Sequence, residues 1–185
     1  MFKPGFREHE EQAATLQEEA DIVSARSIQA LIQWLYTRII NFGTKDNSEC
    51  VSAAIELARL ADKYGIIGIQ SAVADKIRKV ICSRNNQNGS FLRDNTASLK
   101  SAHIISGTFL PRLHPVRRIL AAACVCGYLQ QKNYKFAQEA EDHPNFAADL
   151  LREVQPALDT ASVFRERVFT VRDPVDNAET RLQRT

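Results

Sequence analysis

Residues 28–40 read Ile28-Gln-Ala-Leu-Ile-Gln-Trp-Leu-Tyr-Thr-Arg-Ile-Ile40, and residues 51–65 read Val51-Ser-Ala-Ala-Ile-Glu-Leu-Ala-Arg-Leu-Ala-Asp-Lys-Tyr-Gly65. In both stretches the apolar residues recur with the 3.6-residue period of an amphipathic helix. The alanines of the second stretch would let a neighbouring helix approach closely. The sequence therefore predicts two helices in tandem.

The expected ends of these helices follow from their capping residues. Ser24 or Ser27 can cap the first helix and Ser48 the second, because a serine hydroxyl accepts a hydrogen bond from a free N–H of the first turn. Gly43 and Gly65 can end the helices in the left-handed conformation.

The first helix has an unusually wide apolar face, which places Leu35 at its centre. Its members are Ile28, Leu31, Ile32, Leu35, Tyr36, Ile39 and Phe42. Such a face is either buried on several sides or reaches a partner, and burial in the chain's own core is the more common outcome for most of it. Leu35→Asp is therefore predicted to destabilise the fold by several kcal/mol.

The rest of the chain is also predicted to be mainly helical. Helices are expected over residues 69–81, 96–106, 115–129 and 145–154. Residues 119–129 are apolar on all sides, which predicts a central buried helix, and Arg117-Arg118 before them is interpreted as a solvated first turn. Residues 12–17 are a candidate for one short strand.

Two polar stretches divide the chain. Residues 83–95 predict a linker between a first unit, residues 1–82, and a helical extension, residues 96–160. Residues 161–185 carry scattered arginines and no hydrophobic period, which predicts a flexible tail whose removal leaves the core intact.

The composition is that of an ordinary globular protein. The 185 residues are 44% hydrophobic and 25% charged, with a net charge of +2 that is too mild to argue for a polyanionic partner. The opening residues contain no apolar stretch typical of a secretory signal, and no apolar run approaches membrane-spanning length. The sequence therefore favours an intracellular location, cytoplasmic or nuclear.

The residues that usually carry chemistry form no recognisable site. Cys50, Cys82, Cys124 and Cys126 match no zinc spacing and are interpreted as reduced, mostly buried small hydrophobes. The four histidines show no ligand spacing, and no nucleophile, phosphate-loop or dinucleotide motif occurs. We expect no enzyme activity, no cofactor and no metal.

Several short motifs resemble the later half of BTB/POZ domains. They are Phe6-Arg-Glu8, Thr15-Leu-Gln-Glu18, Trp34-Leu-Tyr-Thr-Arg38 and Ala58-Arg-Leu-Ala-Asp-Lys-Tyr64, in the order of that family. The stretches His114-Pro-Val-Arg-Arg-Ile-Leu-Ala-Ala-Ala123 and Phe146-Ala-Ala-Asp-Leu-Leu-Arg-Glu-Val154 are similar to the trailing region of fungal BTB proteins. The resemblance implies a partial BTB/POZ domain over residues 1–82, the C-terminal half of that α/β fold with one short strand, followed by an all-α extension.

The resemblance also implies a function. BTB/POZ domains are docking modules, so the chain is expected to be a protein–protein adaptor whose partners include another BTB protein or cullin-3 in a ubiquitin ligase. The family's opening strands and helices have no counterpart before Phe6, so the chain is expected to be truncated or degenerate, and its oligomeric state stays open.

Two functional hypotheses follow. In the first, a protein partner contacts an apolar surface of the first two helices, made of Ile28, Leu31, Trp34, Leu35, Leu57 and Leu60, and that surface also promotes association. In the second, the chain is a nucleic-acid-associated regulator in which Arg165, Arg167, Arg172 and Arg181 contact phosphates.

Overall fold

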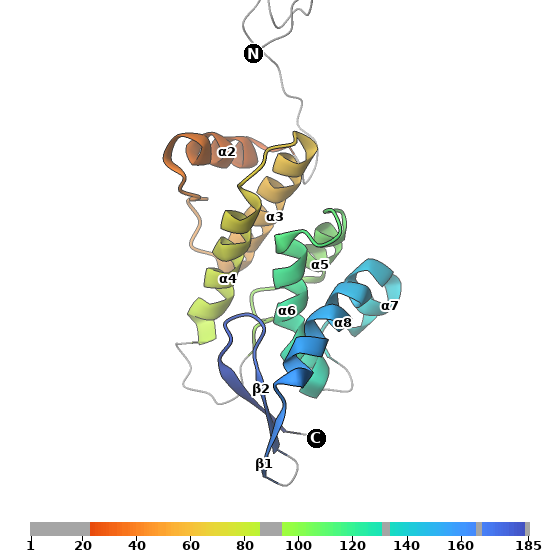
Figure 1. Cartoon of the computed structure of the whole chain (residues 1–185). Helices are drawn as coiled ribbons and strands as arrows, with labels where there is room; N and C mark the ends of the chain where they lie inside the picture. Colours follow the sequence, from red (N-terminus) through yellow and green to blue (C-terminus); the bar gives the residue numbers. More distant parts are fainter. Residues whose placement is uncertain (1–22, 86–93, 131–133, 166–167, 184–185) are drawn as a thin grey trace, which may run out of the picture.

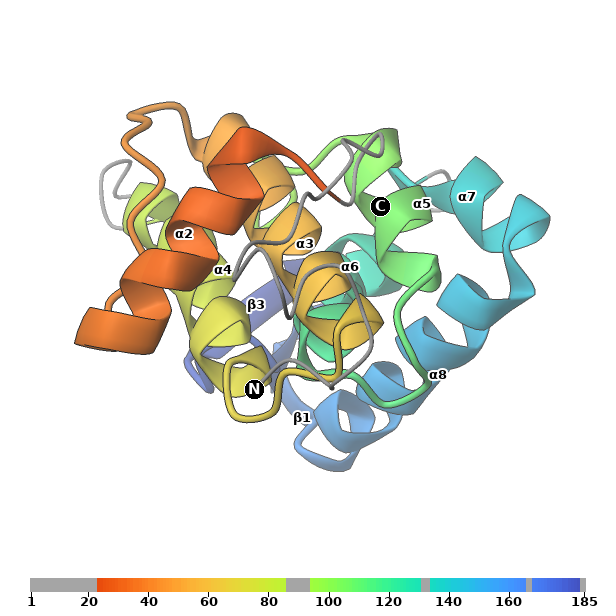
Figure 2. The ribbon, with the colours of Figure 1, turned by 90° about the horizontal axis from the view of Figure 1, so that it is seen from above.

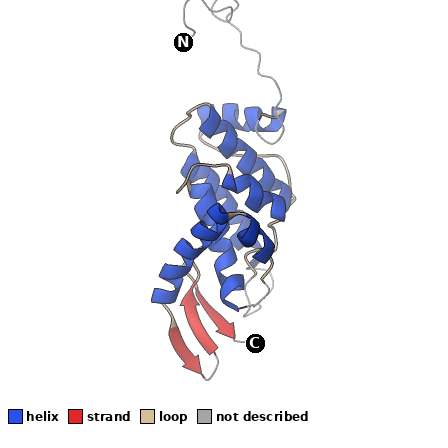
Figure 3. Cartoon of the chain, turned by 90° about the vertical axis from the view of Figure 1, so that its right-hand side faces the viewer, coloured by secondary structure: helices blue, strands red, loops and turns tan. Residues whose placement is uncertain are grey.

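The computed structural model describes residues 23–85, 94–130, 134–165 and 168–183 (Figure 1). Within these ranges the chain is mainly helical, as the sequence predicts, and it ends in a small antiparallel sheet (Figure 3). The helices are α2 (Ala25–Thr37), α3 (Asn47–Lys63), α4 (Gln70–Asn85), α5 (Ser101–Thr108), α6 (Pro115–Gln130), α7 (Ala137–Asp142) and α8 (Pro144–Asp159). The strands are β1 (Ser162–Arg165), β2 (Val168–Arg172) and β3 (Glu179–Gln183). The strand predicted over residues 12–17 lies outside the described residues.

Helix α6 is the centre of the helical part, and it packs against α4, α5 and α8 (Figure 1). Ten of its sixteen residues are buried, so the prediction of a central buried helix is confirmed. Arg117 is one of the ten, so the interpretation of Arg117-Arg118 as a solvated first turn is wrong at Arg117. Close packing against α5 depends on Gly107, because a Cβ at that position would lie 2.8 Å from Cδ1 of Leu120.

Helix α3 connects α2 to this core. It packs against α2 and α4, and Figure 2 shows α2 at the edge of the molecule beside it. The helices before and after residues 86–93 contribute to one hydrophobic core. The predicted linker therefore does not divide the core, and its first residues, 83–85, belong to α4.

The three strands form one sheet of order β1-β2-β3, so the prediction of a flexible tail is wrong. Strands β1 and β3 both pair antiparallel with β2, and Phe169 lies opposite Leu182. Thr180 and Leu182 are buried while Arg181 between them is exposed, which is the two-residue period of a strand. The sequence contains this alternation, but it is only three residues long, which is too short to predict a strand.

The turn between β2 and β3 is anchored to the helices through Asp173, whose side chain is fully buried. Its carboxylate accepts hydrogen bonds from Asn95 Nδ2 at 2.6 Å and from the Val175 N–H at 2.9 Å, and the Cys126 thiol lies 3.6 Å away. Burial is the main cause that raises the pKa of Asp173. The contact joins the sheet to α6 and to the segment before α5.

Several predicted helix ends are wrong for local reasons. Helix α2 ends at Thr37 instead of Gly43, because Arg38 adopts the left-handed conformation with φ 59° and donates its N–H to the Trp34 carbonyl. Asp46, not Ser48, caps α3, and its carboxylate accepts the Ser48 N–H at 2.7 Å. Capping preferences alone do not separate aspartate from serine.

Further along the chain, α5 begins at Ser101 because residues 95–98 form a turn. In that turn the Thr96 N–H and hydroxyl both donate to the Asp94 carboxylate, at 2.9 and 2.6 Å. Helix α8 continues through Pro156 to Asp159, and α7 had no counterpart in the sequence prediction.

The stability prediction for Leu35 is revised, because 50% of this residue is exposed. We now expect Leu35→Asp to change the free energy of unfolding by about 1 kcal/mol or less, since the new carboxylate reaches water. Urea denaturation is the measurement, with Gln29→Asp as the control for placing a charge on an exposed position of α2. A loss of about 3 kcal/mol or more would place Leu35 in the core.

Candidate functional site

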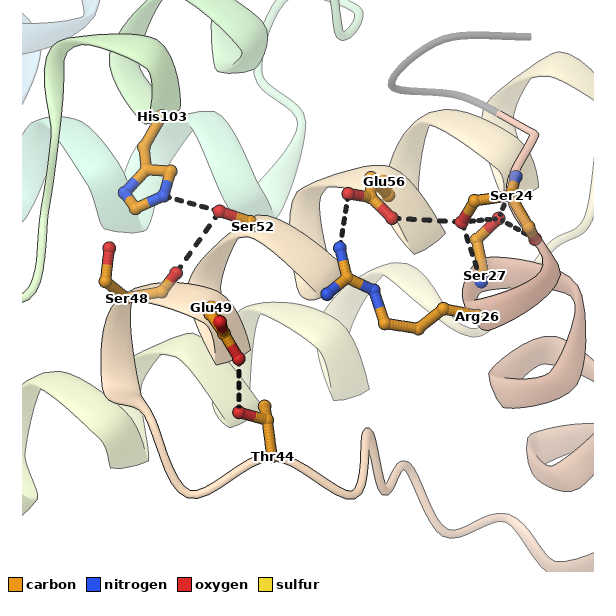
Figure 4. A network of polar contacts seen from close by, with 9 residues as sticks. All are labelled: Ser24, Arg26, Ser27, Thr44, Ser48, Glu49, Ser52, Glu56 and His103. Carbon is orange, nitrogen blue, oxygen red and sulfur yellow. Dashed lines mark hydrogen bonds and ion pairs between the residues drawn. The ribbon is translucent and has the colours of Figure 1, made fainter. Parts of the chain in front are cut away.

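Helix α2 is fixed to α3 by a polar network at its N-terminus (Figure 4). Ser24 caps the helix as predicted: its hydroxyl accepts the Ser27 N–H at 3.1 Å, and Ser27 Oγ accepts the Ser24 N–H at 3.0 Å. Ser24 Oγ also donates to Glu56 of α3 at 3.1 Å, and Arg26 forms an ion pair with the same carboxylate at 2.5 Å. Glu56 thus pairs across helices, while Arg59 stacks over the Phe109 ring.

The inner face of α2 packs into the core. Ser27, Ala30 and Trp34 are buried, and the Trp34 ring also carries the Arg38 guanidinium 4.4 Å from its centroid. Together with the polar network, these contacts set the rotation of α2 about its own axis. The remaining side of the helix therefore has a defined orientation toward solvent.

The opposite side of α2 is apolar as well. Ile32 and Leu35 are each 50% exposed, Tyr36 is 86% exposed and Ile39 is 61% exposed. Ile32, Leu35 and Tyr36 are neighbours on the helix surface through i, i+3 and i+4 spacing, and Ile39 is the second residue after the helix end, beyond Arg38. Residues 27–37 contain no charged side chain. We call Ile32, Leu35, Tyr36 and Ile39 the outer face of α2.

The six residues predicted to contact a partner differ in their exposure to solvent. Trp34, Leu57 and Leu60 are 5%, 0% and 1% exposed, so they are core residues and unavailable to a partner in the folded chain. Ile28 and Leu31 are half-buried. Leu35 is the one member of the set that is exposed.

Three residues of the outer face, Ile32, Tyr36 and Ile39, are missing from the predicted contact set. The sequence contained their signal, because all three lie on the broad apolar stripe of the first helix. The stripe is wide enough to cover two sides of the helix. The hydrophobic period alone could not show which of these sides packs on α3.

A serine and a histidine lie within hydrogen-bonding distance at the α3–α5 contact (Figure 4). Ser52 Oγ is 2.8 Å from Nε2 of His103, while Nδ1 of His103 accepts the Lys100 N–H at 3.1 Å. Nδ1 is therefore unprotonated, and Nε2 carries the proton and donates it to Ser52. A histidine in this tautomer cannot remove a proton from the serine, so the pair lacks the arrangement of a nucleophile and its base.

The pair instead connects two helices. Ser52 Oγ donates to the Ser48 carbonyl at 3.2 Å, so both polar groups are satisfied inside the fold. Burial, followed by the charges of Lys100 and Lys135, lowers the pKa of His103 to about 4. The imidazole is neutral at physiological pH and serves as a hydrogen-bonding bridge between α3 and α5.

The cysteines and possible metal ligands offer no further chemistry in the described part of the chain. All four cysteines are free, and Cys50, Cys124 and Cys126 are buried as predicted, while Cys82 is half-buried. Burial raises the pKa of the Cys50 and Cys124 thiols, which disfavours the reactive thiolate. Within residues 23–183, gaps excepted, no group of three or more His, Cys, Asp or Glu is arranged to hold a metal ion.

None of the helices that the structure describes combines the length and apolar character that a membrane span requires. No protein-family model matches the chain, and no match was found among curated proteins or solved structures.

Proposed function

We propose that this protein is a protein–protein interaction module that binds a partner through the outer face of α2. The observation that carries the proposal is the exposure of three large apolar side chains that are neighbours on α2, Ile32, Leu35 and Tyr36, together with that of Ile39 just beyond the helix. Single exposed apolar residues are common on protein surfaces, but a contiguous uncharged group of them is typical of a contact site.

The shape of this surface favours a protein over a small molecule. A helix face is convex and cannot enclose a ligand, whereas a second helix can pack its ridges into the grooves between the side chains of the first. The partner we propose therefore presents an amphipathic helix. Tyr36 is the expected centre of the contact, because an exposed tyrosine contributes a large apolar area together with a polar hydroxyl.

The resemblance to BTB/POZ domains supports the same class of function. In the finer form of the proposal, the chain is a BTB-type adaptor, and cullin-3 or another BTB protein is its partner. The motif that begins at Trp34 lies at the end of α2, and the motif that begins at Ala58 lies at the end of α3.

The nucleic-acid alternative gains no support from the structure. It placed the contacting arginines in a basic C-terminal tail, and Arg172 and Arg181 of that tail lie on strands β2 and β3. Arg172 is paired in register with Glu179, which places an acidic residue beside it. The side chains of Arg165 and Arg167 lie outside the described residues.

Site-specific photo-crosslinking tests the proposal. We expect p-benzoyl-phenylalanine in place of Tyr36 to crosslink the protein to a partner in cells, because position 36 is at the centre of the outer face. The matched control is the same replacement of Tyr128, a tyrosine of α6 that is 37% exposed and stacks against Tyr134. Position 128 should give no such crosslink.

The partner identified by the crosslink is then purified on its own, and its binding to substituted variants of this chain is titrated. Leu35→Ser should weaken its binding about tenfold or more, as expected for a side chain in an interface centre. Leu151→Ser, a change at an α8 leucine of similar exposure, 57%, should weaken it less than about twofold. Purified cullin-3 is the probe for the finer proposal. Equal binding of the Leu35→Ser and wild-type chains would refute a contact through α2.

A further inference from the structure

A cleft of about 250 Å³ lies between α4 and α6, on a part of the molecule separate from the outer face of α2. One wall is formed by residues of α4, the other by residues of α6. Glu153 of α8 and Pro174 of the β2–β3 turn close it, and Figure 1 shows this turn reaching the helices. The cleft is smaller than a typical cofactor pocket, so it fits a ligand of few atoms.

Charged groups of both signs line the cleft. Arg78 of α4 forms an ion pair with Asp75, and Arg118 of α6 forms one with Glu153 at 2.9 Å through its Nε. The two pairs therefore come from different walls. Two arginines and two carboxylates give the cleft no net charge, which provides no attraction for a simple anion or a simple cation.

Each of these ion pairs uses only part of its hydrogen-bonding capacity. A guanidinium has five N–H donors, and Arg78 and Arg118 each use one side-chain nitrogen in the described structure. Asp75 and Glu153 each use one carboxylate oxygen there. Donors and acceptors therefore both remain for a ligand that lies between the two pairs.

Part of the cleft lining is apolar. Ala74, Ile119 and Ala122 belong to it, and each of them is at most 4% exposed. A ligand that fits this lining has a short aliphatic body and carries a carboxylate and an ammonium group on one end. The carboxylate would face the arginines, and the ammonium group would face Asp75 and Glu153.

From this arrangement we propose that the cleft binds a small aliphatic α-amino acid as its zwitterion. The aliphatic body covers Ile119 and Ala122, and the two charged groups meet the two ion pairs. Charge-assisted hydrogen bonds to both groups account for selectivity over a ligand that carries one of them, because either the two arginines or the two carboxylates would then gain no partner.

Three probes that share the isobutyl group of leucine test the proposal: leucine itself, 4-methylpentanoate, which lacks the ammonium group, and isoamylamine, which lacks the carboxylate. Isothermal titration calorimetry on the full chain should give saturable binding of leucine. Binding of either single-charge probe should be about tenfold weaker or more, as for the loss of a charged hydrogen bond. Equal binding of leucine and 4-methylpentanoate would overturn the zwitterion assignment, and binding of none of the three up to solubility would overturn the site.

Two variants locate the binding. Arg118→Gln and Arg78→Gln should each weaken leucine binding about tenfold. Arg78→Gln keeps the test valid if Arg118→Gln does not fold, because the Arg78–Asp75 pair is roughly half-exposed and contributes little to stability. Arg59→Gln, which changes an arginine stacked on Phe109, is the control and should bind leucine as the wild type does. Leucine binding that survives Arg78→Gln and a folded Arg118→Gln unchanged would place it outside this cleft.

Discussion

Asp149→Ala is expected to reduce the free energy of unfolding by about 3–5 kcal/mol, the range for an ion pair broken inside a protein. Asp149 and Arg117 are 5% and 6% exposed, and Asp149 Oδ2 accepts from Arg117 Nε at 2.6 Å. Removing the carboxylate leaves the buried guanidinium without its counter-charge. The effect is large because Arg117 also donates to the Leu110 and Asn145 carbonyls, at 3.0 and 3.2 Å, and cannot turn toward water without losing both.

Guanidinium chloride denaturation at neutral pH measures this change. Arg152→Gln is the control, because Arg152 binds the other oxygen of Asp149 at 2.9 Å but its side chain is 33% exposed, so about 1 kcal/mol or less is expected. The double variant Arg117→Met with Asp149→Leu should recover part of the loss, since it leaves no buried charge. If Asp149→Ala costs no more than Arg152→Gln, the guanidinium is not isolated from water.

Acidification from pH 7 to pH 5 is expected to lower the free energy of unfolding by about 2 kcal/mol through His103 alone. The pKa of this histidine is about 4 in the folded chain and 6.5 when unperturbed. Between these values the unfolded chain binds more protons than the folded chain, so stability falls as the pH drops through this window and is unaffected above it. Burial also lowers the pKa of His114, which adds to the loss in the same direction.

Urea denaturation at pH 7 and pH 5 measures the loss, and His103→Gln should reduce the difference between the two pH values. Asp173 acts with the opposite sign, because its raised pKa makes stability fall as the pH rises above 3.8. An NMR titration separates these contributions by following the His103 ring directly. A His103 ring that titrates near 6.5 would contradict the account of a buried neutral imidazole.

The sequence predicted the helices where their apolar period is long. The period predicts α3 and α4, whereas α6 is predicted by residues 119–129, which are apolar on all sides and lie at the centre of the helical part. Their boundaries were less certain, since Arg38 rather than Gly43 takes the left-handed conformation that ends α2. Such an end depends on which residue the neighbouring helix leaves free to turn, and no local rule contains that information.

The candidate site could be predicted only in part from the sequence. The stripe of α2 contained every residue of its outer face, but the buried Trp34 and the exposed Leu35 are adjacent and look alike as a pattern. Which of them packs depends on the rotation of α2, which Ser24, Arg26 and Glu56 fix. Glu56 lies about thirty residues from its partners, so the contact exists only after α3 has packed.

The sequence by itself determined the helical class and the apolar stretch of residues 119–129, because period and composition act within one segment. Tertiary structure alone decided that Arg117 is buried, that β1, β2 and β3 form a sheet and that Asp173 accepts a hydrogen bond from Asn95. Each of these depends on groups far apart in the sequence. A buried guanidinium or carboxylate is stable only when a hydrogen-bonding or oppositely charged group from another segment contacts it. Packing of the helices supplies that group.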